Sequence, residues 1–573
     1  MQPCARHPSA SGGKLKRSRI SLGAIALLSA GALALAGCSA TTEPEGGDSS
    51  AIITTNGSEP LFPLVTTNAT ETGAGKILTS IFAGLVSYEA DGSIVNEVAD
   101  SIESEDGQTW NIVLKDGWTF TNGEPVTAAS FANAWNYGAL YDNAQGSSYF
   151  FDNIEGFADV QNTKDDPTGA LAEDGTPLQV GDPLSDGMSG LVVEDDTHLT
   201  VTLSQPSADW PLRLGYTAFM PLPDAAFEDI EAFGENPIGN GPYMLASEGA
   251  WDHDVKIDLI ANPDYDGVRK AANAGLSIIF YTDLGAAYAD AQSGNLDVLD
   301  ALPSDAFGTY QTDFPETYVN QPAAIFQAFN IPYYLAHFGY GEEGTLRRQA
   351  ISMSINRAEI TEVIFQDTRT PATDFTSPVV DGYSDSLAGA EVLEYNPEKA
   401  KELWAEADAI SPYTDVFSIA YNADGGHAEW VDAVANSIVN TLGIQAEGKP
   451  YPTFSDALTD RVNGTLTGAT RAGWQADYPS MANFLAPLYM TGGSSNYEGY
   501  SSAEFDGLLA EGDSAATVDD AILKYQAAQE VLLKDVPTVP LWYSNVTGVY
   551  SPEVQNVVFG WDSVPLYSDI TKG

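Results

Sequence analysis

The order of apolar and polar residues predicts alternating strands and helices from Ala51 onward. Residues 110–114 (WNIVL) and 198–203 (HLTVTL) alternate with the two-residue period of a half-buried strand. Residues 396–404 carry a proline near the start of a stretch with apolar residues at helical spacing. Residues 516–534 have the pattern of an amphipathic helix, and the Asp-Val-Pro that follows ends it. Strands and helices mixed over this length predict an α/β protein with more than one lobe.

The longest apolar run lies near the amino terminus. Residues 21–37 are apolar, end in small residues and are followed by Cys38. The cations that precede the run are Arg6, Lys14, Lys16, Arg17 and Arg19. This arrangement resembles a bacterial lipoprotein signal over residues 1–37, so Cys38 is the expected lipidation site and residues 38–50 a flexible tether. A plain secretory signal or a transmembrane anchor is the alternative, although the run falls short of the about 20 residues that span a bilayer.

Composition limits the chemistry of the rest. After residue 37, 536 residues remain, enough for several domains, and they contain no second long apolar run. Cys4 lies in the signal and Cys38 carries the lipid, so the mature fold has no cysteine for a disulfide, a metal or a nucleophile. The histidines are scattered without the spacing of metal ligands. We therefore expect neither a metal nor a cofactor.

The chain is strongly acidic. Its net charge is −56, and loss of the signal, with five cations and no acid, takes it to −61. Such a surface repels phosphate backbones, which excludes nucleic acid as a partner. It also disfavours adsorption to anionic lipid, so attachment to the membrane requires acyl chains such as palmitate.

The motifs of common enzymes are absent from the sequence. It contains no Gly-x-Ser-x-Gly elbow, no His-Glu-x-x-His and no P-loop. Paired carboxylates do not identify a glycosidase here, because the chain has 80 acidic residues. We expect the protein not to be an enzyme.

Six landmarks occur in one order along the chain. They are GSEPLFPL (57–64), IFAGL (81–85), TWNIVLKDGWTFTNGEPVTAASFANAW (109–135), GNGPY (239–243), LRRQAISMSINR (346–357) and RAGWQADYPSMANFL (471–485). From about residue 51 to the carboxyl terminus, the series resembles the bacterial extracellular solute-binding proteins of family 5, the peptide-binding lipoproteins of ABC importers. The resemblance implies a two-lobed α/β fold of the type II periplasmic-binding-protein class, with an extra inserted domain and a hinge that closes on ligand.

The resemblance also implies the division of the chain and its partners. Lobe I would take residues 51–72, 210–321 and 542–573, the inserted subdomain 73–209, and lobe II 322–541. The protein would capture short peptides in an interlobe cleft and deliver them to an ABC permease, whose ATPase subunits are also separate chains. We expect a monomer, held by lipid at the extracytoplasmic face of the cell membrane.

The family pattern Trp-x-Ala-Asp-Tyr places the amino terminus of the ligand at Asp477. A desolvated ammonium needs a carboxylate partner, because an unpaired buried charge is costly. Trp474 would form a flat apolar wall, and the main chain of Gly473 and Gln475 would pair with an extended peptide. The alternatives are that Asp477 caps a turn before Pro479 and that Trp474 packs in the core.

The carboxyl end of a peptide needs cations, which are scarce in this chain. Arg471, Arg461 and His427 lie at or near positions where related oligopeptide binders hold such cations. Arginine grips a carboxylate with two hydrogen bonds, and histidine binds one when protonated or through its N–H. The alternatives are ordinary salt bridges for the arginines and a surface position for the histidine. Glu59 matches a ligand-facing glutamate that would pair with a basic side chain, with a cap or surface role as its alternative.

The chain departs from the family pattern at three places. Ser130 replaces an acidic residue and Asn356 an aspartate, and we expect both changes to alter caps and turns. Residues 325–328 (IFQA) replace a tyrosine-rich strand, which predicts altered pocket walls. Two other functions therefore stay open. In the first, the same scaffold binds a non-peptide solute such as an oligosaccharide, a metal chelate or an opine. In the second, the protein is a receptor for peptide signals.

Overall fold

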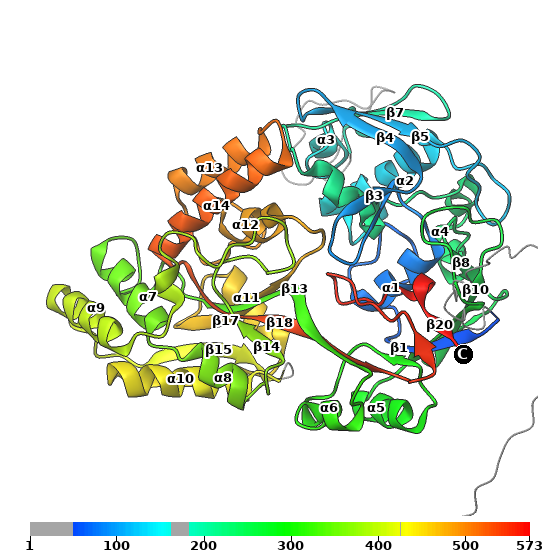
Figure 1. The fold of residues 1–573 in the computed structure, drawn as a ribbon. Helices are drawn as coiled ribbons and strands as arrows, with labels where there is room; N and C mark the ends of the chain where they lie inside the picture. The colour runs from blue at the N-terminus through cyan, green and yellow to red at the C-terminus, as the bar shows by residue number, and fades with distance from the viewer. Residues whose placement is uncertain (1–49, 162–182, 424–425) are drawn as a thin grey trace, which may run out of the picture. The chain divides into compact units, whose positions relative to one another are not determined.

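The computed structural model describes residues 50–161, 183–423 and 426–573, and Figure 1 shows strands and helices alternating through them. This confirms the predicted α/β class. The predicted signal, Cys38 and all but the last residue of the predicted tether lie outside the described residues. In the described part of the chain, no helix has the length and apolar character needed to cross a membrane.

The largest sheet of the described residues has twelve strands. Ten lie side by side in this order: β16 (Ala446–Tyr451), β15 (Phe417–Asn422), β17 (Ala469–Gln475), β13 (Tyr318–Asn330), β18 (Thr538–Tyr550), β12 (Val298–Leu299), β1 (Ile52–Gly57), β11 (Gly275–Phe280), β10 (Lys256–Ala261) and β8 (Tyr243–Leu245). In addition, β14 (Arg369–Pro371) pairs with β18, and β9 (Trp251–Asp252) pairs with β10. The long strand β18 pairs antiparallel with β13 along most of its length and with β12 at its end. These pairings join the strands of the first half of the chain to those of the second.

Smaller sheets complete the strand inventory of the described residues. One sheet has the order β4 (Ala99–Ser104), β5 (Thr109–Leu114), β7 (His198–Thr202) and β6 (Leu191–Val193). The two pairs are β2 (Val86–Tyr88) with β3 (Ile94–Asn96), and β19 (Val554–Gln555) with β20 (Thr571–Lys572). The four-stranded sheet falls within residues 73–209, the range predicted for the inserted subdomain. The boundaries of that subdomain stay a prediction.

The α-helices occur throughout the described residues. They are α1 (Thr72–Ile81), α2 (Ala128–Ala139), α3 (Phe157–Gln161), α4 (Ile230–Glu235), α5 (Leu284–Ser293), α6 (Tyr310–Asp313), α7 (Glu342–Met353), α8 (Arg357–Val363), α9 (Pro397–Ile410), α10 (Ala428–Leu442), α11 (Phe454–Val462), α12 (Met481–Tyr489), α13 (Ala503–Asp513) and α14 (Val518–Asp535). The predicted strands at 110–114 and 198–203 are β5 and β7, and the predicted helices at 396–404 and 516–534 are α9 and α14. All four predictions are confirmed.

Two of the departures from the family pattern lie at helix caps. The main-chain N–H of Thr127 donates to Ser130 Oγ at 3.1 Å, which closes a capping box at the start of α2. Asn356 caps α8, where its Oδ1 accepts from the main-chain N–H of Glu359 at 3.4 Å. Both substituted residues therefore take part in helix caps, and the expectation that they alter the caps of the family stays a prediction.

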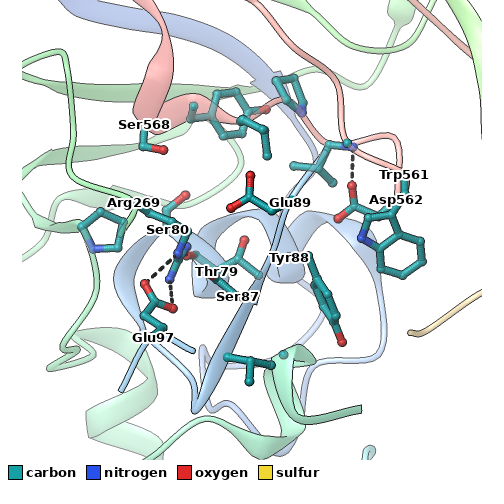
Figure 2. A pocket seen from close by; sticks show the side chains of 18 of the residues that line it. Thr79, Ser80, Ser87, Tyr88, Glu89, Glu97, Arg269, Trp561, Asp562 and Ser568 are labelled. Carbon is teal, nitrogen blue, oxygen red and sulfur yellow. Dashed lines mark hydrogen bonds and ion pairs between the residues drawn. The ribbon is translucent and has the colours of Figure 1, made fainter. Parts of the chain in front are cut away.

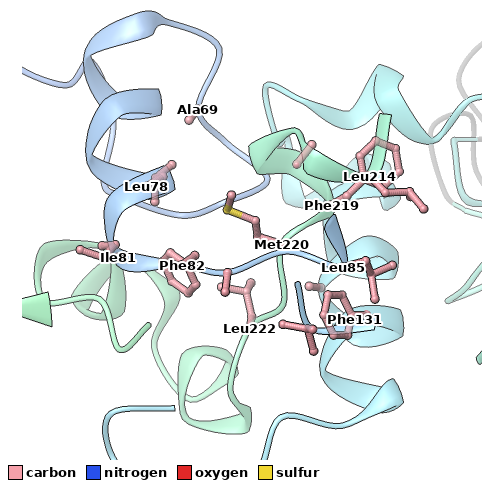
Figure 3. Packing of buried hydrophobic residues seen from close by; sticks show 14 of the residues in the cluster. Ala69, Leu78, Ile81, Phe82, Leu85, Phe131, Leu214, Phe219, Met220 and Leu222 are labelled. Atoms are coloured by element: carbon pink, nitrogen blue, oxygen red, sulfur yellow. The ribbon is translucent and has the colours of Figure 1, made fainter. Parts of the chain in front are cut away.

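The buried apolar residues form two large clusters. One draws mainly on residues 53–323 and the carboxyl-terminal segment, and the other mainly on residues 324–543. Figure 3 shows part of the first cluster, to which the end of α1 contributes Phe82, α2 contributes Phe131 and the turn at residues 217–219 contributes Phe219. Burial of such rings is worth roughly 25 cal/mol per Å² of apolar surface. Strands β13 and β18 contribute residues to both clusters, and two separate cores agree with the two-lobed fold class.

The arginines of the 346–357 motif serve the second core. Arg347, Arg348 and Arg357 are almost fully buried. Arg357 donates to the carbonyl oxygens of Pro540 at 2.7 Å and Leu393 at 2.6 Å, and burial lowers its pKa to about 9. These cations are used to hold main-chain carbonyls, so they are not free to bind ligand.

Candidate ligand-binding site

A cavity of about 390 Å³ lies beside the end of β17. It is lined by α1 and the residues before it, by residues 215–217, by residues 473–477 and by residues 561–564. Its volume falls in the range of small-molecule sites, about 300 to 1,000 Å³. Four predicted site residues line it together, namely Gly473, Trp474, Gln475 and Asp477. The structure therefore brings the predicted amine-binding group to a cavity.

Strand β17 lies between β15 and β13 but is paired unequally with them. Its residues 470–475 pair antiparallel with β13, so Phe326 lies opposite Trp474 and Gln327 opposite Gly473. Pairing with β15 covers only Ala469 and Thr470. Among the described residues, the β15-facing edge from residue 472 to residue 475 therefore has no strand partner. An extended ligand has an open edge to pair with there.

Asn483 in α12 positions the two side chains that define the cavity wall. Its Oδ1 accepts from Trp474 Nε1 at 2.9 Å and from the main-chain N–H of Asp477 at 3.1 Å. Its Nδ2 donates to Asp477 Oδ2 at 3.2 Å. The sequence reasoning missed this residue, although it lies within the 471–485 motif. Asn483 contacts Asp477 because α12 begins directly after the turn that holds Asp477, and its first turn of helix directs the Asn483 amide back toward that carboxyl group.

The carboxyl group of Asp477 is half-buried and forms no ion pair within the described residues. Burial raises its pKa to about 6, and the hydrogen bond from Asn483 acts in the opposite direction. Three other charged residues line the cavity, and of these Asp562 also forms no ion pair within the described residues. Lys76 is ion-paired with Asp300, and Glu71 accepts from the main-chain N–H of Ala74 at 2.8 Å as the cap of α1. Asp477 therefore offers an unpaired carboxylate to a cation inside the cavity.

A second pocket of about 180 Å³ shares Gly473 and Trp474 with the first cavity. Both predicted arginines line it. Arg461 Nε lies 2.8 Å from Glu498 Oε1, with 11% and 8% of the two side chains exposed. Arg471 Nε donates to His427 Nε2 at 3.0 Å. The cations predicted for the carboxyl end of a ligand thus lie together and already have side-chain partners.

His427 lies behind Arg471, away from the two pockets. It is buried and is not among the residues that line either pocket. Its Nδ1 accepts from Trp430 Nε1 at 3.1 Å, and its Nε2 faces Arg471. Neutral imidazole has a single acceptor nitrogen, so the ring can accept only one of these two N–H groups at a time. The alternative of a surface histidine is wrong, and its direct contact with a ligand stays a prediction.

Glu59 follows β1 and is also outside the two pockets. Its Oε1 lies 2.8 Å from His253 Nδ1, and its Oε2 accepts from the main-chain N–H of Asp254 at 2.9 Å. These partners fit the surface alternative, and the contact with a basic ligand side chain stays a prediction. Within the described ranges, no three His, Cys, Asp or Glu side chains are grouped so that they could hold a metal ion.

The sequence and the fold were compared with known proteins. The family model described as "Bacterial extracellular solute-binding proteins, family 5 Middle" matches residues 93–496. The chain is 27% identical over 552 residues to the periplasmic oligopeptide-binding protein OppA of Salmonella typhimurium, with 92% of this chain and 93% of that protein covered. It is 24% identical over 509 residues to the oligopeptide-binding protein OppA of Bacillus subtilis, with 86% and 87% covered.

Solved structures share the fold. The Escherichia coli murein tripeptide binding protein MppA matches with a TM-score of 0.70 at 21% identity, covering 91% of this chain and 98% of MppA. Haemophilus influenzae OppA in complex with RPPGFSPFR matches with a TM-score of 0.68 at 21% identity, covering 92% and 99%. The two-lobed fold class predicted from the sequence is confirmed. The chain belongs to the bacterial extracellular solute-binding proteins of family 5.

Proposed function

We propose that this protein is the substrate-binding component of an ABC importer and captures short peptides with a free amino terminus. One observation carries the proposal. Asp477, a half-buried carboxyl group with no ion pair among the described residues, lines a cavity of about 390 Å³ beside an open strand edge. A peptide supplies both groups that such a site needs, an ammonium for the carboxylate and amides for the strand edge.

The charges on either side of Trp474 support a peptide ligand. Asp477 lies on one side, and Arg471 and Arg461 line the pocket on the other. Asp477 and Arg471 are six residues apart, which is at most about 20 Å in an extended strand. A peptide of a few residues, stretched along β17, would place its ammonium at one end of this path and its carboxylate at the other.

The names of the relatives agree with this ligand class. Those of Salmonella typhimurium and Bacillus subtilis are oligopeptide-binding proteins, and a neighbouring structure of Listeria monocytogenes OppA holds a peptide.

The proposal extends to the partners and the location. The permease and its ATPase subunits are separate chains, and lipid on Cys38 holds the monomeric protein at the extracytoplasmic face. We also propose that the two lobes and the inserted subdomain have the boundaries predicted from the sequence.

The test is to identify what the protein binds. The protein without residues 1–37 is purified, its co-purifying ligands are identified by mass spectrometry, and trialanine, N-acetyl-trialanine and a panel of oligosaccharides are titrated in a calorimeter. We expect co-purified peptides and a clear preference for trialanine over its acetylated form. Binding of oligosaccharides, metal chelates or opines with no binding of peptides would contradict the proposal.

A further inference from the structure

A recess of about 100 Å³ adjoins the main cavity on the side away from β17. The two spaces share Tyr88, Trp561 and Asp562 as lining residues. The Tyr88 and Trp561 rings meet edge to face with centroids 5.3 Å apart. Glu89 and Asp562 also line the recess, and in the view of Figure 2 Asp562 lies next to Trp561 while Glu89 lies between Asp562 and Arg269. The recess therefore extends the cavity past an aromatic wall toward two carboxylates.

The opposite wall of the recess carries a compensated ion pair. Arg269 Nε lies 2.9 Å from Glu97 Oε1, and Arg269 Nη2 lies 3.1 Å from Glu97 Oε2. Arg269 Nη2 also donates to the carbonyl oxygen of Phe82 at 2.9 Å. This bidentate pair leaves no net charge for a ligand at that wall. The charge of the recess comes from Glu89 and Asp562.

Asp562 forms no ion pair among the described residues, although the charge of Lys76 acts to lower its pKa. Its Oδ1 accepts from the main-chain N–H of Val564 at 3.0 Å, and Lys76, which faces the same cavity, is ion-paired with Asp300 instead. Burial raises the pKa of Asp562 to about 6, so most of the group is still ionised at neutral pH. A buried carboxylate in this condition is stabilised by any cation that enters.

A second polar group in the same wall also lacks a partner. Trp561 is 3% exposed, and its Nε1–H has no hydrogen-bond acceptor within the described part of the chain. In Figure 2 the nitrogen edge of the indole lies on the side of Tyr88 and Asp562. A buried donor without an acceptor costs free energy that a ligand carbonyl would recover. With the indole N–H of Trp561 and the carboxylate of Asp562, this wall is complementary to a ligand that has both a hydrogen-bond acceptor and a positive charge.

We infer that Asp562 and Glu89 form a second cation subsite, which binds the lysine or arginine side chain of a peptide near its amino terminus while Trp561 Nε1–H donates to a ligand carbonyl. The inference rests on the proposed function. The aliphatic stem of such a side chain packs against the Tyr88 and Trp561 rings, and its charge is also attracted to their faces.

The Tyr88 phenol links this subsite to the one at Asp477. Burial raises the pKa of Tyr88 well above its ordinary value, and the charges of Asp562 and Asp477 raise it further. Tyr88 and the two carboxylates all line the main cavity. A peptide whose ammonium binds Asp477 would reach Asp562 with the side chain of its first or second residue.

The test compares lysine with its neutral isostere norleucine at each position of a tripeptide. Lys-Ala-Ala, Ala-Lys-Ala, Ala-Ala-Lys, their norleucine counterparts and trialanine are titrated into the full mature protein. In wild type, we expect lysine at position one or two to bind about tenfold more tightly than norleucine, with little difference at position three. Asp562→Asn should remove the preference by weakening Lys-Ala-Ala or Ala-Lys-Ala more than trialanine, and Glu89→Gln should reduce the preference.

The matched control is Asp569→Asn, which removes an exposed carboxylate of the same carboxyl-terminal segment. It should retain the lysine preference. Equal binding of lysine and norleucine peptides to wild type, or an equal loss for every peptide in Asp562→Asn, would overturn the inference while leaving the proposed function in place. If none of the tripeptides bound wild type, the proposed function would fail and the inference with it.

Discussion

The cavity beside Asp477 and the smaller pocket beside Arg461 hold their charges in opposite ways. Among the residues that the structure describes, Asp477 has only the amide of Asn483 as a side-chain partner, and its pKa is raised to about 6. Arg461 is ion-paired with Glu498, and Arg471 donates to His427. A ligand ammonium therefore meets an uncompensated carboxylate, whereas a ligand carboxylate meets cations that already have partners. We expect the amino end of the ligand to contribute more affinity than its carboxyl end.

The largest effect is expected from Asp477→Asn. Loss of one charge-assisted hydrogen bond of roughly 1.5–3 kcal/mol should weaken trialanine binding by about ten- to hundredfold in calorimetry. N-acetyl-trialanine has no ammonium and should lose little. Because the raised pKa makes the ionised group unfavourable in the ligand-free fold, the variant should unfold at the same temperature or higher. Equal losses for the two peptides would argue against an amine-binding role.

The pH dependence tests the same group without a mutation. A carboxyl with a pKa of about 6 is mostly ionised at pH 7 and mostly protonated at pH 5. The ligand ammonium keeps its proton throughout that range, so trialanine affinity should fall about tenfold from pH 7 to pH 5. Asp513 and Asp562 have similarly raised pKa values of about 6, so Asp477→Asn serves as the control. An unchanged pH profile in that variant would assign the titration to another group.

Changes in the second pocket should have smaller effects. Arg471→Gln should weaken trialanine binding about fivefold and leave its carboxamide unaffected. Glu498→Gln should strengthen trialanine binding about threefold, because it releases Arg461 from its ion pair. Both variants are compared with wild type by calorimetry using the acid and the amide. If Glu498→Gln weakened both ligands alike, Glu498 would be holding the pocket together instead of restraining Arg461.

The smallest change is expected from Asn483→Leu. The substitution removes the acceptor of Trp474 Nε1 and the donor to Asp477 Oδ2, so both side chains lose their positioning. Trialanine affinity should fall about twofold. The pH midpoint for binding should also rise, since the Asn483 hydrogen bond lowers the pKa of Asp477. A loss of affinity with no shift of the midpoint would indicate a purely structural role.

Local patterns were enough to predict several elements and one wall of the site. The period-two runs at 110–114 and 198–203 form β5 and β7, and the capped amphipathic run at 516–534 forms α14. The residues from Gly473 to Asp477 were predicted from one contiguous motif, and they line the cavity together. These features depend on neighbours in sequence, so short-range reasoning reaches them.

The groups that were not predicted depend on contacts across the chain. Glu498 neutralises Arg461 from 37 residues away, and Glu59 meets His253 across 194 residues. Asp562 reaches the cavity only because the carboxyl-terminal segment packs beside Tyr88. No local pattern specifies such partners, because many acidic residues along the chain satisfy the same local rules. The arginines show this difference. Arg347, Arg348 and Arg357 are buried in the second core, whereas Arg461 and Arg471 line a pocket.

The most direct test is a crystal structure of the mature protein with bound trialanine. The account predicts that the peptide lies extended along the open edge of β17, with its ammonium within about 3.2 Å of the Asp477 carboxylate and its carboxylate on the arginine side of Trp474. A peptide bound in the opposite direction, or with its ammonium away from Asp477, would contradict it.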